Sequence, residues 1–187
     1  MNRRRTATVI GAVASTMVVT GCIHPNDGLE LRYGQNVGDM ALREDIVQVK
    51  KFYPGSPWLS FDEAGDPNPE GFKVNVYLLS AANGLGVFGD GNIVVTMYTV
   101  PEIQPEGAPP AEPCLQKRWV LTPEDCMPFR ATRRTVMGYG YGLRLSWGDV
   151  DVLGKTVIIT IAFERRDGTM IQSQPQTFRV PPRWTVY

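Results

Sequence analysis

The sequence contains one histidine, His24, among 187 residues. Histidine is the general base of Ser-His-Asp hydrolases and of Cys-His enzymes, and it is the commonest metal ligand. A single histidine near the start of the chain therefore excludes these catalytic sets and any metal site built from several histidines. We expect no catalytic residues, no metal and no cofactor, and we predict that the protein is not an enzyme.

An excess of basic charge is also missing. The chain has 19 Lys and Arg residues and 19 Asp and Glu residues, whereas a nucleic-acid-binding domain presents a basic surface to phosphates. We therefore expect no nucleic-acid partner. Helical periodicity is missing beyond a turn or two, and the one long apolar run, residues 7–20, is too short to cross a bilayer as a helix.

The apolar run follows three arginines at residues 3–5 and leads into Val-Thr-Gly-Cys at residues 19–22. A basic start, a short apolar stretch and small residues before a cleavage point are typical of a secretory signal peptide. The segment resembles the lipobox signal of exported bacterial lipoproteins, with Val19 where leucine is more usual. The resemblance implies cleavage before Cys22 and lipidation of its thiol; ordinary secretion and an uncleaved anchor are the alternatives.

This signal determines how the chain is divided. Residues 1–21 form the signal peptide, residues 22–43 the lipidated N-terminus with a flexible tether, and residues 44–187 the folded domain. Removal of the signal takes three of the 19 basic residues and no acid, so the mature domain is mildly acidic. Ile23 rather than Asp follows Cys22, which in the sorting rule of bacterial lipoproteins favours the outer membrane. We expect a lipid-anchored protein of the cell envelope.

Two further cysteines remain, Cys114 and Cys126. An even pair in an oxidising compartment is most simply a disulfide, which for so short a loop would contribute about 3 kcal/mol. A zinc site needs more ligands than two cysteines, and a redox pair has CxxC spacing. We therefore predict a structural disulfide between them.

From residue 44 onward the apolar residues alternate with a period of two, which predicts strands. Asp167-Gly168 is a strong hairpin signal, since both central positions of a type I′ turn require positive φ. We predict an all-β fold, an antiparallel β-sandwich of the immunoglobulin-like or C2-like kind with seven to eight strands. A closed barrel is the alternative. The predicted strands are residues 44–53, 58–61, 72–80, 92–100, 119–121, 133–147, 155–165 and 169–180.

The pattern of residues 72–79, 93–98 and 143–147, followed by the Asp-Gly hairpin, is similar to a family of uncharacterised bacterial envelope lipoproteins. The resemblance covers most of the mature chain. It contains no catalytic motif, so it implies no functional residue.

Acidic side chains gather at two places in the sequence. The first loop offers oxygen atoms that suit Ca²⁺, although its spacing is not that of an EF-hand and a solvated connector is the simpler interpretation. Its polar residues are Asp62, Glu63, Asp66, Asn68 and Glu70. Asp149 and Asp151 form a second pair, which we interpret as turn-capping residues. Convergence of two of Asp62, Asp66, Asp149, Asp151 and Glu164 in one pocket would favour an enzyme.

Residues 137–147 are the most unusual internal segment. As a strand, they would place Met137, Tyr139, Tyr141 and further apolar residues on one face, and glycines on the other. An aromatic platform for a sugar or peptide is one interpretation. A core strand with a buried aromatic face is the preferred one, with the glycines allowing close approach of a neighbouring segment or a bulge.

Five cations surround the predicted disulfide loop, and they are interpreted as a solvated face or as a contact for lipid phosphates or an acidic partner. They are Lys117, Arg118, Arg130, Arg133 and Arg134. Three tryptophans near loops or strand ends, Trp58, Trp119 and Trp184, are predicted to pack in the core or as lids, with exposed anchors for a partner as the alternative.

These observations predict a membrane-anchored envelope lipoprotein that acts as a non-enzymatic interaction or structural module. A carbohydrate- or calcium-binding β-sandwich is the alternative. The expected partners are the lipid bilayer, through acylated Cys22, and an envelope protein or glycan.

Overall fold

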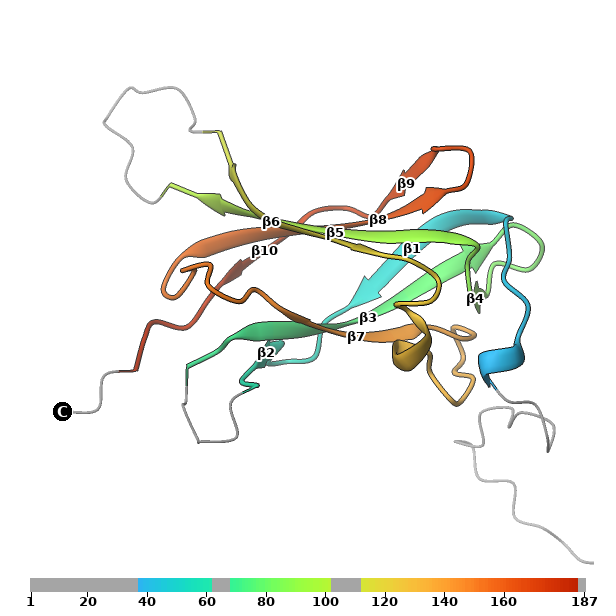
Figure 1. Ribbon diagram of the computed structural model, residues 1–187, viewed down its shortest axis with the longest axis horizontal. Helices are drawn as coiled ribbons and strands as arrows, with labels where there is room; N and C mark the ends of the chain where they lie inside the picture. Colours follow the sequence, from blue (N-terminus) through green and yellow to red (C-terminus); the bar gives the residue numbers. More distant parts are fainter. Residues whose placement is uncertain (1–36, 62–67, 102–111, 185–187) are drawn as a thin grey trace, which may run out of the picture.

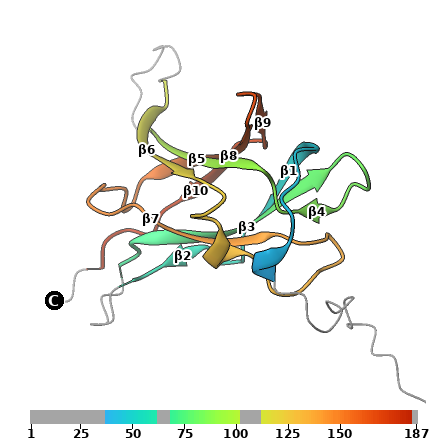
Figure 2. The ribbon, with the colours of Figure 1, turned by 45° about the vertical axis from the view of Figure 1, so that its right-hand side comes forward.

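The structure is a computed structural model of the 187-residue chain, and it describes residues 37–61, 68–101 and 112–184. In these residues ten strands form two antiparallel sheets that pack face to face (Figure 1). Turning the molecule by 45° shows the same two layers (Figure 2). The predicted antiparallel β-sandwich is confirmed, and the alternative of a closed barrel is wrong.

The first sheet is built around β3 (Gly71–Ser80), which pairs with four other strands. On one side of β3 lie β1 (Ile46–Phe52) and β2 (Trp58–Leu59), and on the other lie β4 (Gly86–Val87) and β7 (Tyr141–Ser146). The second sheet has the order β10 (Gln176–Arg179), β8 (Thr156–Arg165), β5 (Gly91–Val100), β6 (Cys114–Leu121), with β9 (Met170–Gln172) paired to β8. Two short 3₁₀ helices, η1 (Val37–Asp39) and η2 (Met127–Phe129), complete the described elements.

The strand order is immunoglobulin-like. If the seven principal strands are lettered along the chain as A, B, C, C′, E, F and G, the sheets are A-B-E (β1, β3, β7) and G-F-C-C′ (β10, β8, β5, β6). This arrangement distributes consecutive strands between the two sheets as immunoglobulin domains do. The other three strands, β2, β4 and β9, are short additions at the edges. The count exceeds the predicted seven or eight because β4 was not predicted and the predicted strand at residues 169–180 forms two strands, β9 and β10.

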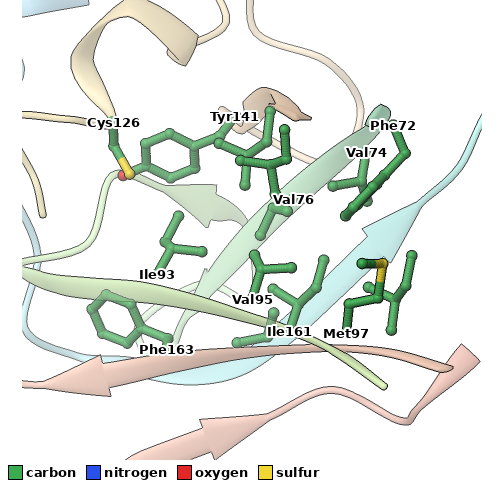
Figure 3. Close-up of a cluster of buried hydrophobic side chains, with 14 of the residues drawn as sticks. Phe72, Val74, Val76, Ile93, Val95, Met97, Cys126, Tyr141, Ile161 and Phe163 are labelled. Atoms are coloured by element: carbon green, nitrogen blue, oxygen red, sulfur yellow. The ribbon is translucent and has the colours of Figure 1, made fainter. Parts of the chain in front are cut away.

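The inward faces of the central strands make the core. The predicted alternation is confirmed on β3, β5 and β8, where every second side chain is almost fully buried. Each such burial contributes about 1.5–3 kcal/mol relative to an exposed side chain. Figure 3 shows Val74 and Val76 of β3 opposite Val95 and Ile161 of the second sheet. Among the residues that the structure describes, the core cluster extends from Val37 to Val180.

The structure differs from the expected strand boundaries in two places. The predicted strand at residues 133–147 begins only at Tyr141, because Gly138 has a φ of 95° and the chain turns there. The predicted strand at residues 169–180 divides into β9 and β10. Residues 37–43, assigned to the tether, contact the sandwich: the Arg43 N–H donates to the carbonyl of Phe88 at 2.8 Å.

The two ends of the sandwich carry different parts of the chain (Figure 1). At the N-terminal end lie η1, the turn after β3, the β8–β9 hairpin and residues 122–140, which connect β6 to β7. At the C-terminal end lie the β7–β8 connection and the last described residues. The antiparallel registers fix this arrangement, since Ile46 pairs with Ser80 and Gly91 pairs with Arg165.

Asp45 fastens the start of β1 to the turn after β3. Its carboxylate accepts hydrogen bonds from Arg43 Nε at 3.0 Å, from Ser80 Oγ at 2.5 Å and from the Ala82 N–H at 3.3 Å. The Arg43 guanidinium and the Ser80 hydroxyl lower the pKa of Asp45 to about 2. The folded domain therefore favours the ionised form of the Asp45 carboxylate.

A carboxyl whose pKa is lower in the folded than in the unfolded chain stabilises the fold above its unfolded pKa of about 4, and this contribution disappears as the pH falls through about 2. We expect the difference in unfolding free energy between the wild type and Asp45→Asn to shrink as the pH falls from about 4 to about 2. Urea denaturation across that range measures it. Asp39→Asn, at an exposed position of η1, is the control. A difference for Asp45→Asn that is constant with pH would contradict the assignment.

Candidate functional site

A polar groove lies at the N-terminal end, between the start of β5 and the end of β8. It is a hollow of about 460 Å³ whose lining includes Asp90, Asn92, Glu164 and Arg166. Arg166 Nη2 lies 2.8 Å from Asp90 Oδ1, and Asn92 Nδ2 donates to Glu164 Oε2 at 3.1 Å. Asn92 and Glu164 are cross-strand neighbours, so the sheet itself holds this pair in place. The groove is therefore polar: Asp90 and Arg166 pair with each other, and Glu164 is held by the Asn92 amide.

A second hollow of about 280 Å³ lies at the C-terminal end. Asp149 and Asp151 both line it, so these two predicted carboxylates are brought together, while Glu164 lies in the other groove. Asp151 is exposed and lies 3.9 Å from Lys155 Nζ and 4.0 Å from Arg183 Nη2. A pair of catalytic acids needs fixed separation on rigid elements, whereas these carboxylates occupy an exposed loop.

The acidic loop of the sequence analysis is only partly described. Asp62, Glu63 and Asp66 lie outside the described residues. Asn68 Oδ1 accepts a hydrogen bond from the Trp184 N–H at 2.7 Å, and Glu70 Oε2 accepts one from the Phe61 N–H at 2.8 Å. Within residues 37–61, 68–101 and 112–184, no three His, Cys, Asp or Glu side chains are grouped to hold a metal ion.

The glycine- and tyrosine-rich segment is a core strand from Tyr141 onward. Tyr141, Leu143, Leu145 and Trp147 are buried, so the interpretation as an exposed aromatic platform is wrong for β7. The hydroxyl of Tyr141 accepts a hydrogen bond from the buried Gly89 N–H at 3.1 Å, and burial raises the pKa of this phenol. Figure 3 shows the Tyr141 ring pointing into the core beside the sulfur of Cys126.

The residues before Tyr141 form a tight turn instead of a strand. We call residues 135–138 the tip turn. Thr135 and Gly138 exchange two backbone hydrogen bonds of 2.9 Å, and Val136 between them is 92 % exposed. The backbone of Gly86 is hydrogen-bonded on both sides of Gly138, through the carbonyl of Met137 at 2.6 Å and the N–H of Tyr139 at 2.8 Å. The predicted close approach at a glycine is confirmed here.

The five predicted cations do not form one patch. Lys117 Nζ lies 5.4 Å from the ring centre of Trp119, and Arg118 is exposed on the same strand. Arg130 is half-buried, with its guanidinium 4.6 Å from the ring centre of Phe88 and Nη1 donating to the carbonyl of Val37 at 3.2 Å. Arg133 and Arg134 lie in the connection just before the tip turn.

The three tryptophans have two kinds of environment. Trp58 packs edge-on against Trp147 with ring centres 6.1 Å apart. Trp119 packs against Phe72 and donates from Nε1 to the carbonyl of Ser146 at 3.1 Å, which links the edges of the two sheets. Packing is therefore confirmed for these two, while Trp184 is 66 % exposed.

The predicted disulfide between Cys114 and Cys126 is not formed, and this corrects the sequence analysis. Cys114 is exposed at the start of β6, and Cys126 is buried beyond the end of the same strand. A strand rises about 3.3 Å per residue, so the eight residues of β6 span more than 20 Å. A disulfide requires Cα atoms within about 7 Å. Burial raises the pKa of the Cys126 thiol to about 12, which makes it unreactive.

We therefore expect a maleimide reagent to label Cys114 rapidly in the folded domain and Cys126 only after unfolding. The reason is that Cys114 is exposed to the reagent, whereas Cys126 is buried and burial disfavours its thiolate. Mass spectrometry of labelled peptides, without added reductant, measures both sites. Cys126→Ser leaves the fast site in place and serves as the control. If neither thiol reacts in the unfolded, unreduced chain, the two cysteines are joined in a disulfide and the assignment of free thiols is wrong.

Several predicted features lie outside the described residues. These are Cys22, His24, the signal segment at residues 1–21 and the remaining tether up to residue 36. None of the described segments forms a helix long and apolar enough to cross a membrane.

No protein-family model, curated protein or solved structure matches the chain. The fold and the chemistry of its own residues are thus the basis for a functional assignment. Two features of these sites were not predicted from the sequence: the Asp90–Arg166 pair and the exposed tip turn. The basic character around the tip turn does have a signal in the sequence, because residues 127–148 contain four arginines and no acidic residue.

Proposed function

We propose that this protein is a membrane-anchored envelope lipoprotein whose immunoglobulin-like domain acts as a non-enzymatic interaction or structural module. The resemblance of residues 19–22 to a lipobox supports the anchor. The observation that best supports a non-enzymatic role is that charged side chains lining the two hollows contact other side chains of the protein. Asp90 pairs with Arg166, Glu164 accepts from Asn92, and Asp151 lies beside Lys155 and Arg183.

Acylated Cys22 would hold the domain on the outer membrane, with the bilayer as its first partner and an envelope protein or glycan as its second. A single acyl chain binds membranes only marginally, whereas several chains anchor a protein stably. The sandwich would then be held close to the lipid surface, within the reach of the tether.

The anchor is tested by expressing the full chain in a bacterium that processes lipoproteins. Mass spectrometry of the N-terminal peptide should find Cys22 as residue one and acylated, with the protein in the membrane fraction. The Cys22→Ser variant should lose both properties, while Cys114→Ser should keep them. A wild-type protein without acyl groups in the soluble fraction would refute the anchor. Cross-linking of the acylated protein then identifies its envelope partner.

A carbohydrate-binding module is the second candidate, and the groove at Asp90 favours it. The groove is open and lined by carboxylate, amide and guanidinium groups, which are suited to bind sugar hydroxyls. A ligand that binds only the native state raises the melting midpoint. Thermal melts with cell-wall oligosaccharides and with Ca²⁺ test this candidate and the calcium alternative, and the absence of a shift at millimolar ligand would refute both.

A further inference from the structure

The chain enters the sandwich beside the tip turn. The carbonyl of Val37, the first described residue, accepts a hydrogen bond from Arg130 Nη1 at 3.2 Å. Arg130 belongs to the same connection between β6 and β7 as the tip turn, and Figure 1 shows η1 next to this connection at one end of the sandwich. Only 14 residues, 23–36, separate Cys22 from Val37, and the 15 Cα–Cα steps between them reach at most about 50 Å when fully extended.

The tip turn presents an apolar side chain on a rigid support. Val136 is 92 % exposed, the largest exposed fraction among the large hydrophobic residues of the described chain. Thr135 Oγ1 donates to the carbonyl of Gly138 at 3.0 Å and accepts from the Met137 N–H at 3.1 Å, in addition to the backbone bonds of the turn. Because the turn is already ordered, insertion of Val136 into another phase costs little conformational entropy.

The charge beside the tip turn is basic. Arg133 and Arg134 precede it, and within the described residues neither forms an ion pair. No acidic residue occurs between Asp125 and Asp149. The nearest acid in sequence, Asp125, is occupied, since its Oδ2 accepts from the N–H of Thr122 at 3.0 Å and from its hydroxyl at 2.9 Å. Acidic residues do occur elsewhere at this end, among them the exposed Asp39 of η1 and Glu124 at the start of the connection, so the basic character belongs to the tip rather than to the whole end.

We propose that the tip turn docks on anionic phospholipid headgroups, with Val136 entering the interface and Arg133 and Arg134 contacting phosphates. This inference rests on the proposed lipid anchor, which would hold the N-terminal end within reach of the bilayer. Two cations and one apolar side chain give only weak binding by themselves. Beside an acyl anchor they are sufficient to orient the domain, with its C-terminal end and Trp184 pointing away from the membrane.

The test uses the non-acylated chain 23–187, which retains all of the core residues that the structure describes. Its partitioning is measured by co-sedimentation with phosphatidylcholine vesicles, with and without phosphatidylglycerol. We expect binding only to the anionic vesicles, weakened by added salt because the charges are exposed. The Arg133→Glu/Arg134→Glu double variant should bind at least about 25-fold more weakly, since each surface cation contributes about a factor of five and the new carboxylates are repelled by the anionic lipid. Val136→Ser should bind roughly tenfold more weakly.

The matched control is Lys73→Glu/Arg144→Glu, a cross-strand pair on the outer face of the first sheet. It changes the net charge by the same amount as the double variant, so it should reduce binding only slightly if the tip is the contact. Thermal melts establish that each variant is folded.

Equal binding of the wild type to neutral and anionic vesicles, or equal losses in the two double variants, would overturn the proposal. An acidic protein cross-linked to the tip without vesicle binding would overturn it as well. Because the chain in this assay has no acyl group, a failure of docking is distinguishable from a failure of acylation at Cys22.

Discussion

Replacement of Gly138 by alanine is expected to destabilise the domain by about 3 kcal/mol or more and to displace the tip turn. Gly138 has a φ of 95°, a conformation that costs a residue with a side chain about 1–3 kcal/mol. A Cβ there would also lie 2.4 Å from both the N and the O atom of Gly86, which are backbone atoms of β4. Urea denaturation of the variant measures the loss.

Gly168→Ala separates the two causes. Gly168 has a similar φ of 82° in the β8–β9 hairpin, but a Cβ there meets nothing within 4 Å. This control should therefore lose only the conformational part, about 1–2 kcal/mol. If the two variants lose the same stability, the close approach of the tip turn to β4 is not what holds the turn in place.

The tip turn also shows why part of this molecule escapes prediction from sequence. Tyr139 and Tyr141 alternate with glycines as strand residues would, and this alternation predicted one strand through residues 133–147. The chain turns at Gly138 because Gly86, more than 50 residues earlier, occupies the space where a side chain would be. A tertiary contact of this kind leaves no local signal other than the glycine itself.

The central strands were predictable for the opposite reason. A strand buried on one face imposes a period of two on its own sequence, and Phe72 through Leu78 on β3 repeat it without interruption. β5 and β8 each bear a similar pattern, so their inward faces followed directly from the sequence. Hairpin signals such as Asp167-Gly168 added the order in which the strands meet.

Predictions that required two residues to lie close together in space were less successful. Cys114 and Cys126 are close in sequence, but an extended strand occupies most of the interval and separates them. Asp149 and Asp151 lie together because they share a loop, whereas Glu164 belongs to the other end of the sandwich. The sequence shows that these cysteines and carboxylates are present, whereas the registers of the sheets determine which of them lie close together.

Replacement of Phe88 by alanine is expected to cost about 3–5 kcal/mol, the usual loss for a buried phenylalanine. Phe88 is 1 % exposed, and its ring centre lies 5.7 Å from that of Tyr139 and 5.3 Å from that of Tyr141. The Arg130 guanidinium covers the same ring at 4.6 Å. Since native domains are stable by only about 5–15 kcal/mol, this single change removes a large fraction of the total.

Phe88 also supports the tip turn, because its ring lies beneath both Tyr139 and Arg130 on either side of that turn. Phe88→Leu, which keeps an apolar side chain in the cavity, should lose clearly less stability and leave the turn in place. A double-mutant cycle with Arg130→Met should give a coupling of about 0.5–1 kcal/mol for the cation over the ring. If Phe88→Ala lowers stability without increasing hydrogen exchange at residues 135–138, the ring is only part of the core. If exchange rises there as well, the aromatic cluster is what makes Val136 a rigid projection.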